Sequence, residues 1–182
     1  LAHLTTGESL TCDRLLLATG GNKDSAGLVI ARTLGHAIEP PVPSLFTFHV
    51  DDPRLRGLEG ISVENVAAAA ATLRETGPLL VTHWGLSGPA ILKLSAWGAR
   101  ALHETGYRFA LTVNFVPPHT RESLARKLAA VRATHPRRQI GSWSPLAVPQ
   151  RLWERLVAAA GIALTTPWTS VSRADLDALT AQ

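Results

Sequence analysis

The chain has 182 residues, 46% of them hydrophobic and 18% charged, which is typical of a globular protein that buries a core. No run of about 18 apolar residues is present, which argues against a membrane-spanning helix, and the single cysteine, Cys12, excludes an internal disulfide. The formal net charge of +4 is moderately basic, so composition excludes neither a polyanionic partner nor an ordinary solvated surface.

The single cysteine indicates a reducing compartment, and the sequence shows no basic-then-apolar leader. Both features predict a cytoplasmic protein. The sequence contains no methionine, begins at Leu1, and has a strand-like pattern from its first residues. We therefore expect it to be a piece of a longer protein.

The N-terminal part predicts a hairpin followed by a strand, a glycine turn and a helix. A Thr6-Gly7 turn separates two β-prone runs, and residues 14–18 predict a short buried strand that stops at Thr19-Gly20-Gly21. Helical spacing over residues 25–36 ends at Gly35, a typical C-terminal cap. This order is that of half a βαβ unit.

The middle of the chain predicts strands. A proline-rich stretch at residues 39–45 predicts an extended boundary between two regions. Strands are expected at residues 46–50, 77–85 and 107–117. Residues 61–73 are ambiguous, because five consecutive alanines favour a helix whereas three β-branched residues favour a strand.

Residues 82–98 predict a strand that turns into a helix. The strand is expected to end at residues 83–85, with Ser87 as the N-cap of the helix and Pro89 in its first turn. Gly85 and Gly88 permit a tight turn and the close approach of another group. A helix N-terminus of this kind can hold an anion, but a capped turn that binds nothing also accounts for the pattern.

No catalytic residue and no metal site are predicted. The run from Gly85 to Pro89 departs from the Gly-x-Ser-x-Gly elbow of hydrolases, so His83 and Ser87 do not indicate hydrolysis. The seven histidines lack metal-ligand spacing, and neither a Gly-x-Gly-x-x-Gly fingerprint nor a Walker motif is present.

From Pro118 onward the pattern predicts helices. Leu124, Leu128 and Val131 form one apolar stripe, residues 148–161 predict a second helix, and Ser172 begins a capping box. Basic residues crowd the first of these helices and the segment after it: Arg121, Arg126, Lys127, Arg132, Arg137 and Arg138. We favour a solvated helix face over a nucleic-acid surface, because no aromatic residue is interleaved to stack on bases.

Four blocks of sequence together resemble one family. They are LLLATGG, ARTLGHAIEPPVPSLFTF, LLVTHWGLSGPAILKLS and LTVNFVP, which occur in this order over residues 10–118. In order and spacing they resemble the HI0933-like family of FAD-dependent flavoproteins. The string Thr-His-x-Gly-Leu-Ser-Gly-Pro-Ala-Ile-Leu is the most specific part of the resemblance.

The resemblance implies an α+β fold in three parts. Residues 1–40 correspond to a short remnant of a Rossmann-like FAD-binding domain, residues 41–118 to a small antiparallel β-barrel, and residues 119–182 to a helical, helix-two-turn-helix-like part. It also decides the ambiguous alanine-rich segment in favour of a strand.

The resemblance also implies site residues. Ala18, Thr19, Gly20 and Gly21 match the family's flavin-contact motif, and His83, Ser87 and Gly88 are candidates for the substrate side. The following loop, residues 22–27, is shorter than is usual in the family, which puts flavin contacts from this loop in doubt.

The implied parent protein is an FAD-dependent oxidoreductase, to which this chain supplies the inserted domain and one flavin-contacting strand. We expect the chain alone to lack catalysis and not to hold FAD tightly. Its expected partners are the remainder of its own FAD domain and a small-molecule substrate, with small amines and steroid-like enones both in the family's range. Neither a membrane nor nucleic acid is favoured as a partner.

Two alternatives use the helical part. One is a nucleic-acid-binding module that contacts phosphates through the basic segment at residues 121–138. The other is a protein-docking module anchored by tryptophans, namely Trp143, Trp153 and Trp168.

Overall fold

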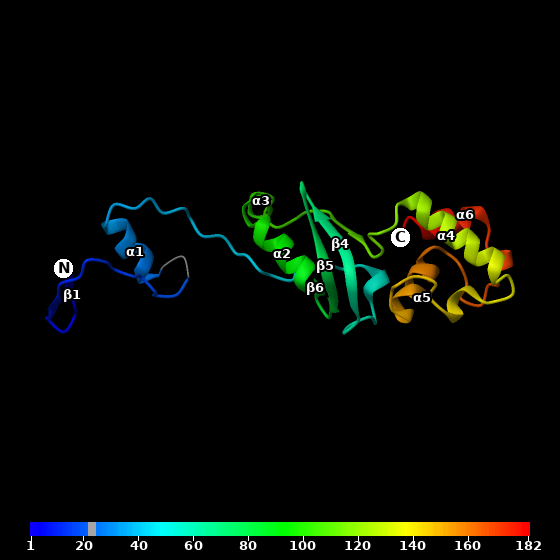
Figure 1. Cartoon of the computed structure of the whole chain (residues 1–182), viewed down its shortest axis with the longest axis horizontal. Helices are drawn as coiled ribbons and strands as arrows, with labels where there is room; N and C mark the ends of the chain where they lie inside the picture. Colours follow the sequence, from blue (N-terminus) through cyan, green and yellow to red (C-terminus); the bar gives the residue numbers. More distant parts are fainter. Residues whose placement is uncertain (22–24) are drawn as a thin grey trace. The chain divides into compact units, whose positions relative to one another are not determined.

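The computed structural model describes residues 1–21 and 25–182, which form two compact units, residues 1–42 and 43–182. Helices and strands mix in an α+β arrangement (Figure 1). In chain order the elements are β1 (Ala2–His3), β2 (Ser9–Leu10), α1 (Ala26–Thr33), β3 (Phe48–His49), η1 (Pro53–Leu55), β4 (Ser62–Ala70), β5 (Leu73–Thr82), β6 (Gly85–Ser87), α2 (Pro89–Trp97), α3 (Ala99–Glu104), β7 (Leu111–Asn114), α4 (Arg121–Thr134), η2 (Ile140–Ser142), α5 (Gln150–Ala159), η3 (Trp168–Ser170) and α6 (Arg173–Leu179), where η denotes a short 3-10 helix.

The N-terminal unit contains the predicted hairpin and the predicted helix. β1 and β2 pair antiparallel around the turn at Gly7. The Ser25 hydroxyl caps α1 by accepting a hydrogen bond from the backbone N–H of Leu28. The helix ends as expected, because Gly35 takes a φ of 89° and the N–H of His36 reaches back to the carbonyl of Ala31 at 3.1 Å.

The buried strand predicted at residues 14–18 is wrong for this structure. The segment is extended but belongs to neither sheet, and Leu16 is 87% exposed. A strand needs a neighbour to complete its hydrogen bonds and an apolar layer to cover its side chains. Among the described residues, no strand pairs with this segment.

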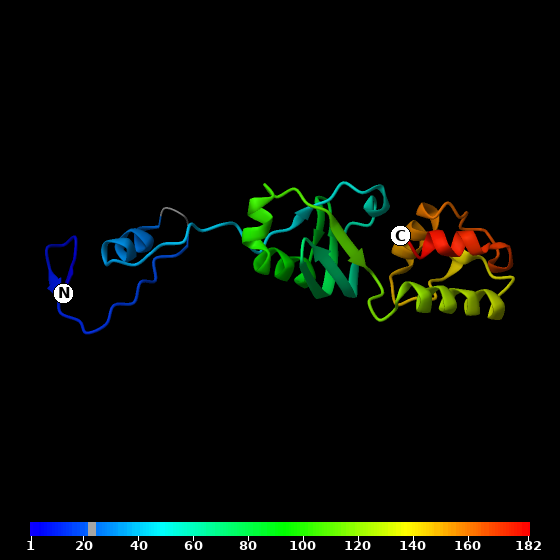
Figure 2. The same ribbon diagram turned by 90° about the horizontal axis from the view of Figure 1, so that it is seen from above.

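The C-terminal unit is built on one antiparallel sheet of five strands in the order β3-β6-β5-β4-β7. The sheet curls into an open barrel, which Figures 1 and 2 show from two sides. The two edge strands do not pair in the described sheet. Aromatic rings bridge the gap between these two strands instead, with the ring centroids of Phe48 and Phe109 4.9 Å apart. We call this gap the seam.

The alanine-rich segment is a strand, as the resemblance implies. β4 lies between β5 and β7, so both edges of its backbone are hydrogen-bonded. Val66, Ala68 and Ala70 belong to the buried core. Tertiary pairing therefore overrides the helix propensity of alanine.

β5 begins at Leu73 and not at the Gly-Pro pair from which the sequence predicts it to start. The strand passes through Gly77 and Pro78, and the register of β4 against it shifts between Val63 and Val66. Two β4 residues, Glu64 and Asn65, therefore lie opposite a single β5 residue, Pro78. A bulge suits this position, because proline has no N–H to donate to the ladder.

The helix after β6 is not capped by Ser87, which corrects the sequence prediction. Ser87 is the last residue of β6 and pairs with Leu80, and the N-cap of α2 is Gly88, with φ of 94° and no side-chain cap bond. A Cβ on Gly88 would lie 2.9 Å from the carbonyl oxygen of Pro78. The close backbone approach to β5 therefore fixes the start of the helix.

The other helix predictions are confirmed. In α4, Leu128 is buried and flanked by the half-buried Leu124 and Val131. α5 forms within the predicted residues 148–161 and buries Leu152, Leu156 and Val157. In α6 both bonds of the capping box form, with the N–H of Ser172 donating to Asp175 at 2.8 Å and the N–H of Asp175 donating to Ser172 at 3.1 Å.

Two of the three tryptophans considered as docking anchors are core residues instead. Trp153 and Trp168 are 1% and 0% exposed, and their rings stack with centroids 6.3 Å apart. Trp153 Nε1 donates to the carbonyl of Ile140 at 2.8 Å, whereas Trp168 Nε1 has no partner among the described residues. Of these three tryptophans, Trp143 alone is partly exposed and can therefore contact a partner.

The close approach of β3 to β6 predicts a large effect of Gly85→Ala. A Cβ on Gly85 would overlap the Phe48 carbonyl oxygen and the Val50 backbone nitrogen, and its φ of 140° disfavours side chains. We expect the free energy of unfolding to fall by about 3 kcal/mol or more in denaturant titrations. The matched control is Gly161→Ala, where φ is 79° but nothing lies within 4 Å of the added atom, and the expected loss is about 1 kcal/mol. Equal losses would contradict the account.

Candidate functional site

The seam of the barrel contains an open cavity of about 850 Å³. Its walls include four aromatic side chains, from Phe46, Phe48, Tyr107 and Phe109. The rings of Phe46 and Tyr107 meet edge to face at 5.7 Å, as do those of Phe48 and Phe109 at 4.9 Å. Aromatic walls of this kind favour a flat, largely apolar ligand.

Polar groups border the aromatic walls of the seam. His49, Thr47 and Arg108 line the cavity. The Thr47 hydroxyl donates to the Ser87 hydroxyl at 3.2 Å, which connects a predicted substrate-side residue to this cavity. Hydroxyl, imidazole and guanidinium groups can all donate hydrogen bonds to a carbonyl oxygen. The seam can therefore bind a planar molecule that carries a carbonyl group.

The predicted substrate-side residues do not all lie together. Ser87 and Gly88 are adjacent, at the junction of β6 with α2. His83 is exposed in the turn between β5 and β6, at the other end of β6. Near this turn, backbone hydrogen bonds from Glu59 itself and from Gly57 lower the pKa of Glu59, with a smaller contribution from the charge of His83.

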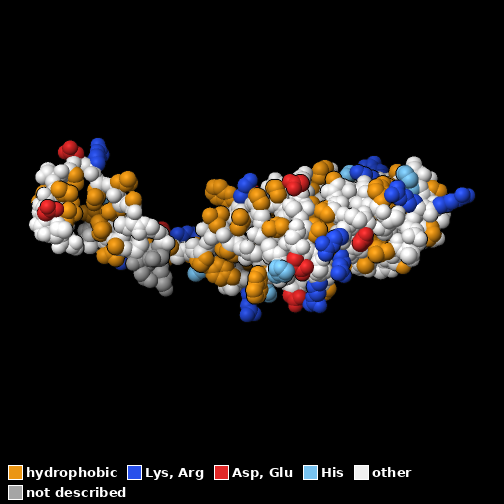
Figure 3. Space-filling view, turned by 90° about the horizontal axis from the view of Figure 1, so that it is seen from below, with side chains coloured by type: hydrophobic (Ala, Val, Ile, Leu, Met, Phe, Trp, Pro, Cys, Tyr) orange, Lys and Arg blue, Asp and Glu red, His pale blue; other side chains and the backbone are white. Residues whose placement is uncertain are grey.

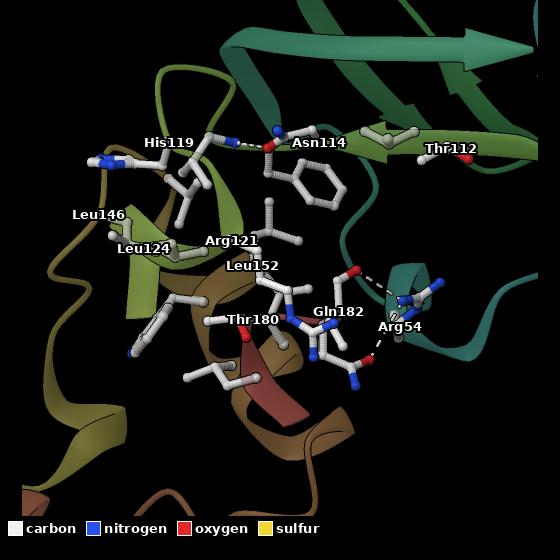
Figure 4. A pocket seen from close by; sticks show the side chains of 18 of the residues that line it. Arg54, Thr112, Asn114, His119, Arg121, Leu124, Leu146, Leu152, Thr180 and Gln182 are labelled. Atoms are coloured by element: carbon white, nitrogen blue, oxygen red, sulfur yellow. Dashed lines mark hydrogen bonds between the residues drawn. The ribbon is translucent and has the colours of Figure 1, made fainter. Parts of the chain in front are cut away.

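A second cavity, of about 450 Å³, lies where β7 faces the helical part (Figure 4). Its apolar walls include the side chains of Leu124, Leu128, Leu146, Val148 and Leu152. Asn114 Oδ1 accepts a hydrogen bond from the N–H of Val116 at 2.8 Å. His119 lies 3.4 Å from the Ser123 hydroxyl and points away from Arg54 in Figure 4. None of the predicted substrate-side residues lines this cavity.

An ion pair holds one wall of this second cavity. Arg54 donates to Asp52 through Nη2 at 2.6 Å and through Nε at 3.0 Å, and its Nη1 donates to the Gln182 backbone carbonyl at 3.1 Å. The side-chain hydrogen bond from Arg54 lowers the pKa of Asp52, and the same bond raises the pKa of Arg54. Both groups stay charged near neutral pH, so the pair acts as a clamp and not as an acid or base.

The predicted flavin-contact residues lie in an exposed segment of the N-terminal unit that has no regular secondary structure. The Thr19 side chain rests on Gly27, in the first turn of α1. Gly20 has a φ of 75°, and an added Cβ on Gly20 or Gly21 would meet nothing within 4 Å. Bare, accessible backbone beside a helix N-terminus fits a large cofactor that carries phosphates. Residues 22–24 of the loop noted in the sequence lie outside the described residues.

Other kinds of site find no support in the described part of the chain. No helix there is long and apolar enough to cross a membrane. No group of three or more His, Cys, Asp and Glu side chains among the described residues could hold a metal ion. Cys12 is a free, exposed thiol.

None of the predicted flavin-contact or substrate-side residues lines either cavity, although Ser87 is hydrogen-bonded to Thr47, which lines the seam. Arg121 and Trp153, which the sequence offered for the alternative roles, line the second cavity. The seam joins the β3 strand to the segment before β7, about 60 residues later, and no local motif marks that pairing. The available signals were the alternation of Phe46 with Phe48 and that of Tyr107 with Phe109.

Comparison with known proteins shows a family and several relatives. Residues 42–182 match the family described as HI0933-like protein barrel and H2TH domain. Over 161 residues the chain is 30% identical to the ribosomal RNA dihydrouridine synthase of Escherichia coli K12, covering 82% of this chain and 37% of the relative. Over 121 residues it is 29% identical to the 3-dehydro-bile acid delta(4,6)-reductase of Clostridium scindens, covering 61% of this chain and 29% of the relative.

A third relative is the ribosomal RNA dihydrouridine synthase of Haemophilus influenzae, 37% identical over 92 residues, which cover 46% of this chain and 23% of the relative. The chain therefore spans only between about a quarter and just over a third of the length of these relatives.

The clamp formed by Asp52 and Arg54 predicts a pH-dependent stability. A lowered carboxyl pKa stabilises the folded state above the unfolded-state pKa, and this contribution is lost as pH falls toward the folded-state pKa. Asp52→Asn should therefore cost under about 1 kcal/mol of unfolding free energy near neutral pH, and the difference should vanish in acid. The measurement is chemical denaturation across pH. Asp51→Asn, which breaks the exposed pair with Arg56, is the control and should show a smaller difference. A difference for Asp52→Asn that persists in acid would contradict the prediction.

Proposed function

The chain belongs to the HI0933-like family, and from this membership we propose that it is the inserted domain of a flavin-dependent oxidoreductase that reduces a carbon–carbon double bond conjugated to a carbonyl group. Two kinds of relatives support the reaction class. A dihydrouridine synthase saturates the ring double bond of uracil, and the double bonds of a 3-dehydro delta(4,6) bile acid are conjugated to its ketone. These unlike substrates share one reaction.

The observation that carries the proposal is the seam. Its aromatic walls suit a flat conjugated ring, and His49, Arg108 and the adjoining Ser87, whose hydroxyl accepts from Thr47, offer donors for a carbonyl oxygen. Hydrogen bonds to that oxygen withdraw electrons from the conjugated double bond and stabilise the negative charge that develops when hydride adds to it. Ser87 and Gly88 are the substrate-side candidates that this arrangement favours, with His83 at the far end of β6.

FAD, when bound, supplies the hydride. The exposed backbone of Ala18, Thr19, Gly20 and Gly21 lies beside the cofactor in this proposal. The remaining contacts to FAD come from the rest of the parent's FAD domain, which is the principal partner of this chain, and the chain by itself is not catalytic. The parent acts in the cytoplasm on a substrate bound at the seam.

The proposal predicts a yellow full-length protein. Its anaerobically reduced flavin should be reoxidised by a conjugated cyclic ketone and not by the saturated ketone, as followed by flavin absorbance. Ser87→Ala should slow this reoxidation by about tenfold or more, because it removes a hydrogen-bond donor. Ser62→Ala, at an exposed position on β4, is the matched control and should change nothing. A colourless protein that takes up no added FAD would rule the proposal out.

The flavin contact predicts an effect of Gly21→Val on cofactor content. An added Cβ meets nothing within 4 Å in the described structure, so we expect thermal unfolding of the apoprotein to be nearly unchanged. The valine side chain would occupy space beside this segment where the cofactor is proposed to lie. We expect the flavin absorbance per protein to fall several-fold, whereas Ala37→Val, at another exposed position of the N-terminal unit, should retain full flavin. Full flavin in Gly21→Val would contradict the assigned contact.

A further inference from the structure

The basic charge of the chain is concentrated in its helical part. Residues 119–182 contain nine Lys and Arg against four Asp and Glu, whereas residues 1–118 contain nine against ten. Between Glu122 and Glu154 there is no acidic residue, but six basic ones occur. In Figure 3 Lys, Arg and His side chains outnumber acidic ones over the helical part of the C-terminal unit.

The basic residues of this segment differ in what they do. Arg132 is a structural residue, because its Nη1 donates to the Val171 carbonyl at 2.9 Å. Arg126, Lys127 and Arg137 are exposed, and none has a hydrogen bond or an ion pair with another described residue. Three cations are therefore free to meet an anionic partner.

No aromatic residue occurs between residues 121 and 138 of the sequence. After α4, however, the fold places the ring of Trp143 beside Arg138. The guanidinium of Arg138 lies 4.5 Å from the centroid of the Trp143 ring, and Arg138 Nε donates to the Ser142 hydroxyl at 3.2 Å. The His135 ring lies 5.3 Å from the same tryptophan. We call His135, Arg137, Arg138 and Trp143 the platform.

The backbone of the platform is anchored to the core. The carbonyl of Arg138 accepts from the N–H of Trp168 at 2.9 Å, and the carbonyl of Pro136 accepts from the N–H of Thr169 at 2.8 Å. The next residue after Gln139 is Ile140, which is fully buried and whose carbonyl accepts from Trp153. Because the backbone of this segment is held in place, little backbone conformational entropy is lost on binding.

We propose that the platform, together with Arg126 and Lys127, is a docking surface for structured RNA. Guanidinium and ammonium groups pair with phosphates, and an arginine stacked on an aromatic ring offers flat surfaces for an unpaired base. The 82% of this chain that aligns with a ribosomal RNA dihydrouridine synthase supports RNA as the polyanion. The inference rests on the proposed function and narrows its substrate to a uracil ring within RNA.

The test uses the full-length holoprotein and a uridine-containing ribosomal RNA transcript, with binding followed by fluorescence polarization across salt concentrations. Arg137→Gln combined with Arg138→Gln should weaken binding about tenfold or more and reduce the salt slope by roughly one to two units. Trp143→Ala should weaken binding with a nearly unchanged slope, because stacking displaces few counterions. The charge-matched control combines Arg74→Gln with Lys93→Gln, two exposed positions outside the helical part, and should bind as the unmodified protein does.

Flavin absorbance and reoxidation by the conjugated ketone report separately on the proposed function, and both should be unchanged in the platform variants. Loss of RNA binding in these variants supports the platform even if no ketone is reduced. No RNA binding by the unmodified protein, or equal losses in platform and control variants, would overturn the inference. Preferential binding to phosphatidylserine vesicles or to an acidic peptide would overturn it in favour of a different partner.

Discussion

The close contact between backbones around β6 is the constraint on which the C-terminal unit depends. β3 crosses Gly85 so closely that a Cβ would overlap it, and β5 passes Gly88 so closely that a Cβ there would lie only 2.9 Å from the Pro78 carbonyl oxygen. These contacts set the path of β6, and they place α2 directly on β5 and β4, where Ala90 and Ile91 are fully buried. Because β6 holds β3 in the sheet, the same contacts define one side of the seam.

Sequence patterns predicted the elements whose determinants are local. The capping box at Ser172, the apolar stripe around Leu128 and the glycine end of α1 each need only neighbouring residues, and each is present. The alanine-rich strand and the true start of β5 depend on partners elsewhere in the chain, so composition could not decide them. Ser87 is not the cap because it is the last paired residue of β6, opposite Leu80, so the cap position falls one residue later, at Gly88.

The candidate sites were predictable to a smaller extent. Ser87 was selected from sequence, but its partner Thr47 and the aromatic walls come from segments up to about 60 residues apart. In the helical part the sequence showed arginines without aromatic neighbours, and the fold supplied Trp143 through a turn that packs on buried Trp168. Both surfaces combine aromatic faces with hydrogen-bond donors, the chemistry that a uracil ring in RNA requires.

The central claim is that one RNA engages both surfaces, with the reacting ring at the seam and the surrounding RNA on the platform. Ultraviolet cross-linking of the full-length protein to a uridine-containing ribosomal RNA fragment, followed by mass spectrometry of the attached peptides, tests it most directly. The account predicts cross-links within residues 135–143 and within residues 43–51 or 107–111. Cross-links confined to other surfaces, such as the exposed faces of β5 and α2, would contradict it.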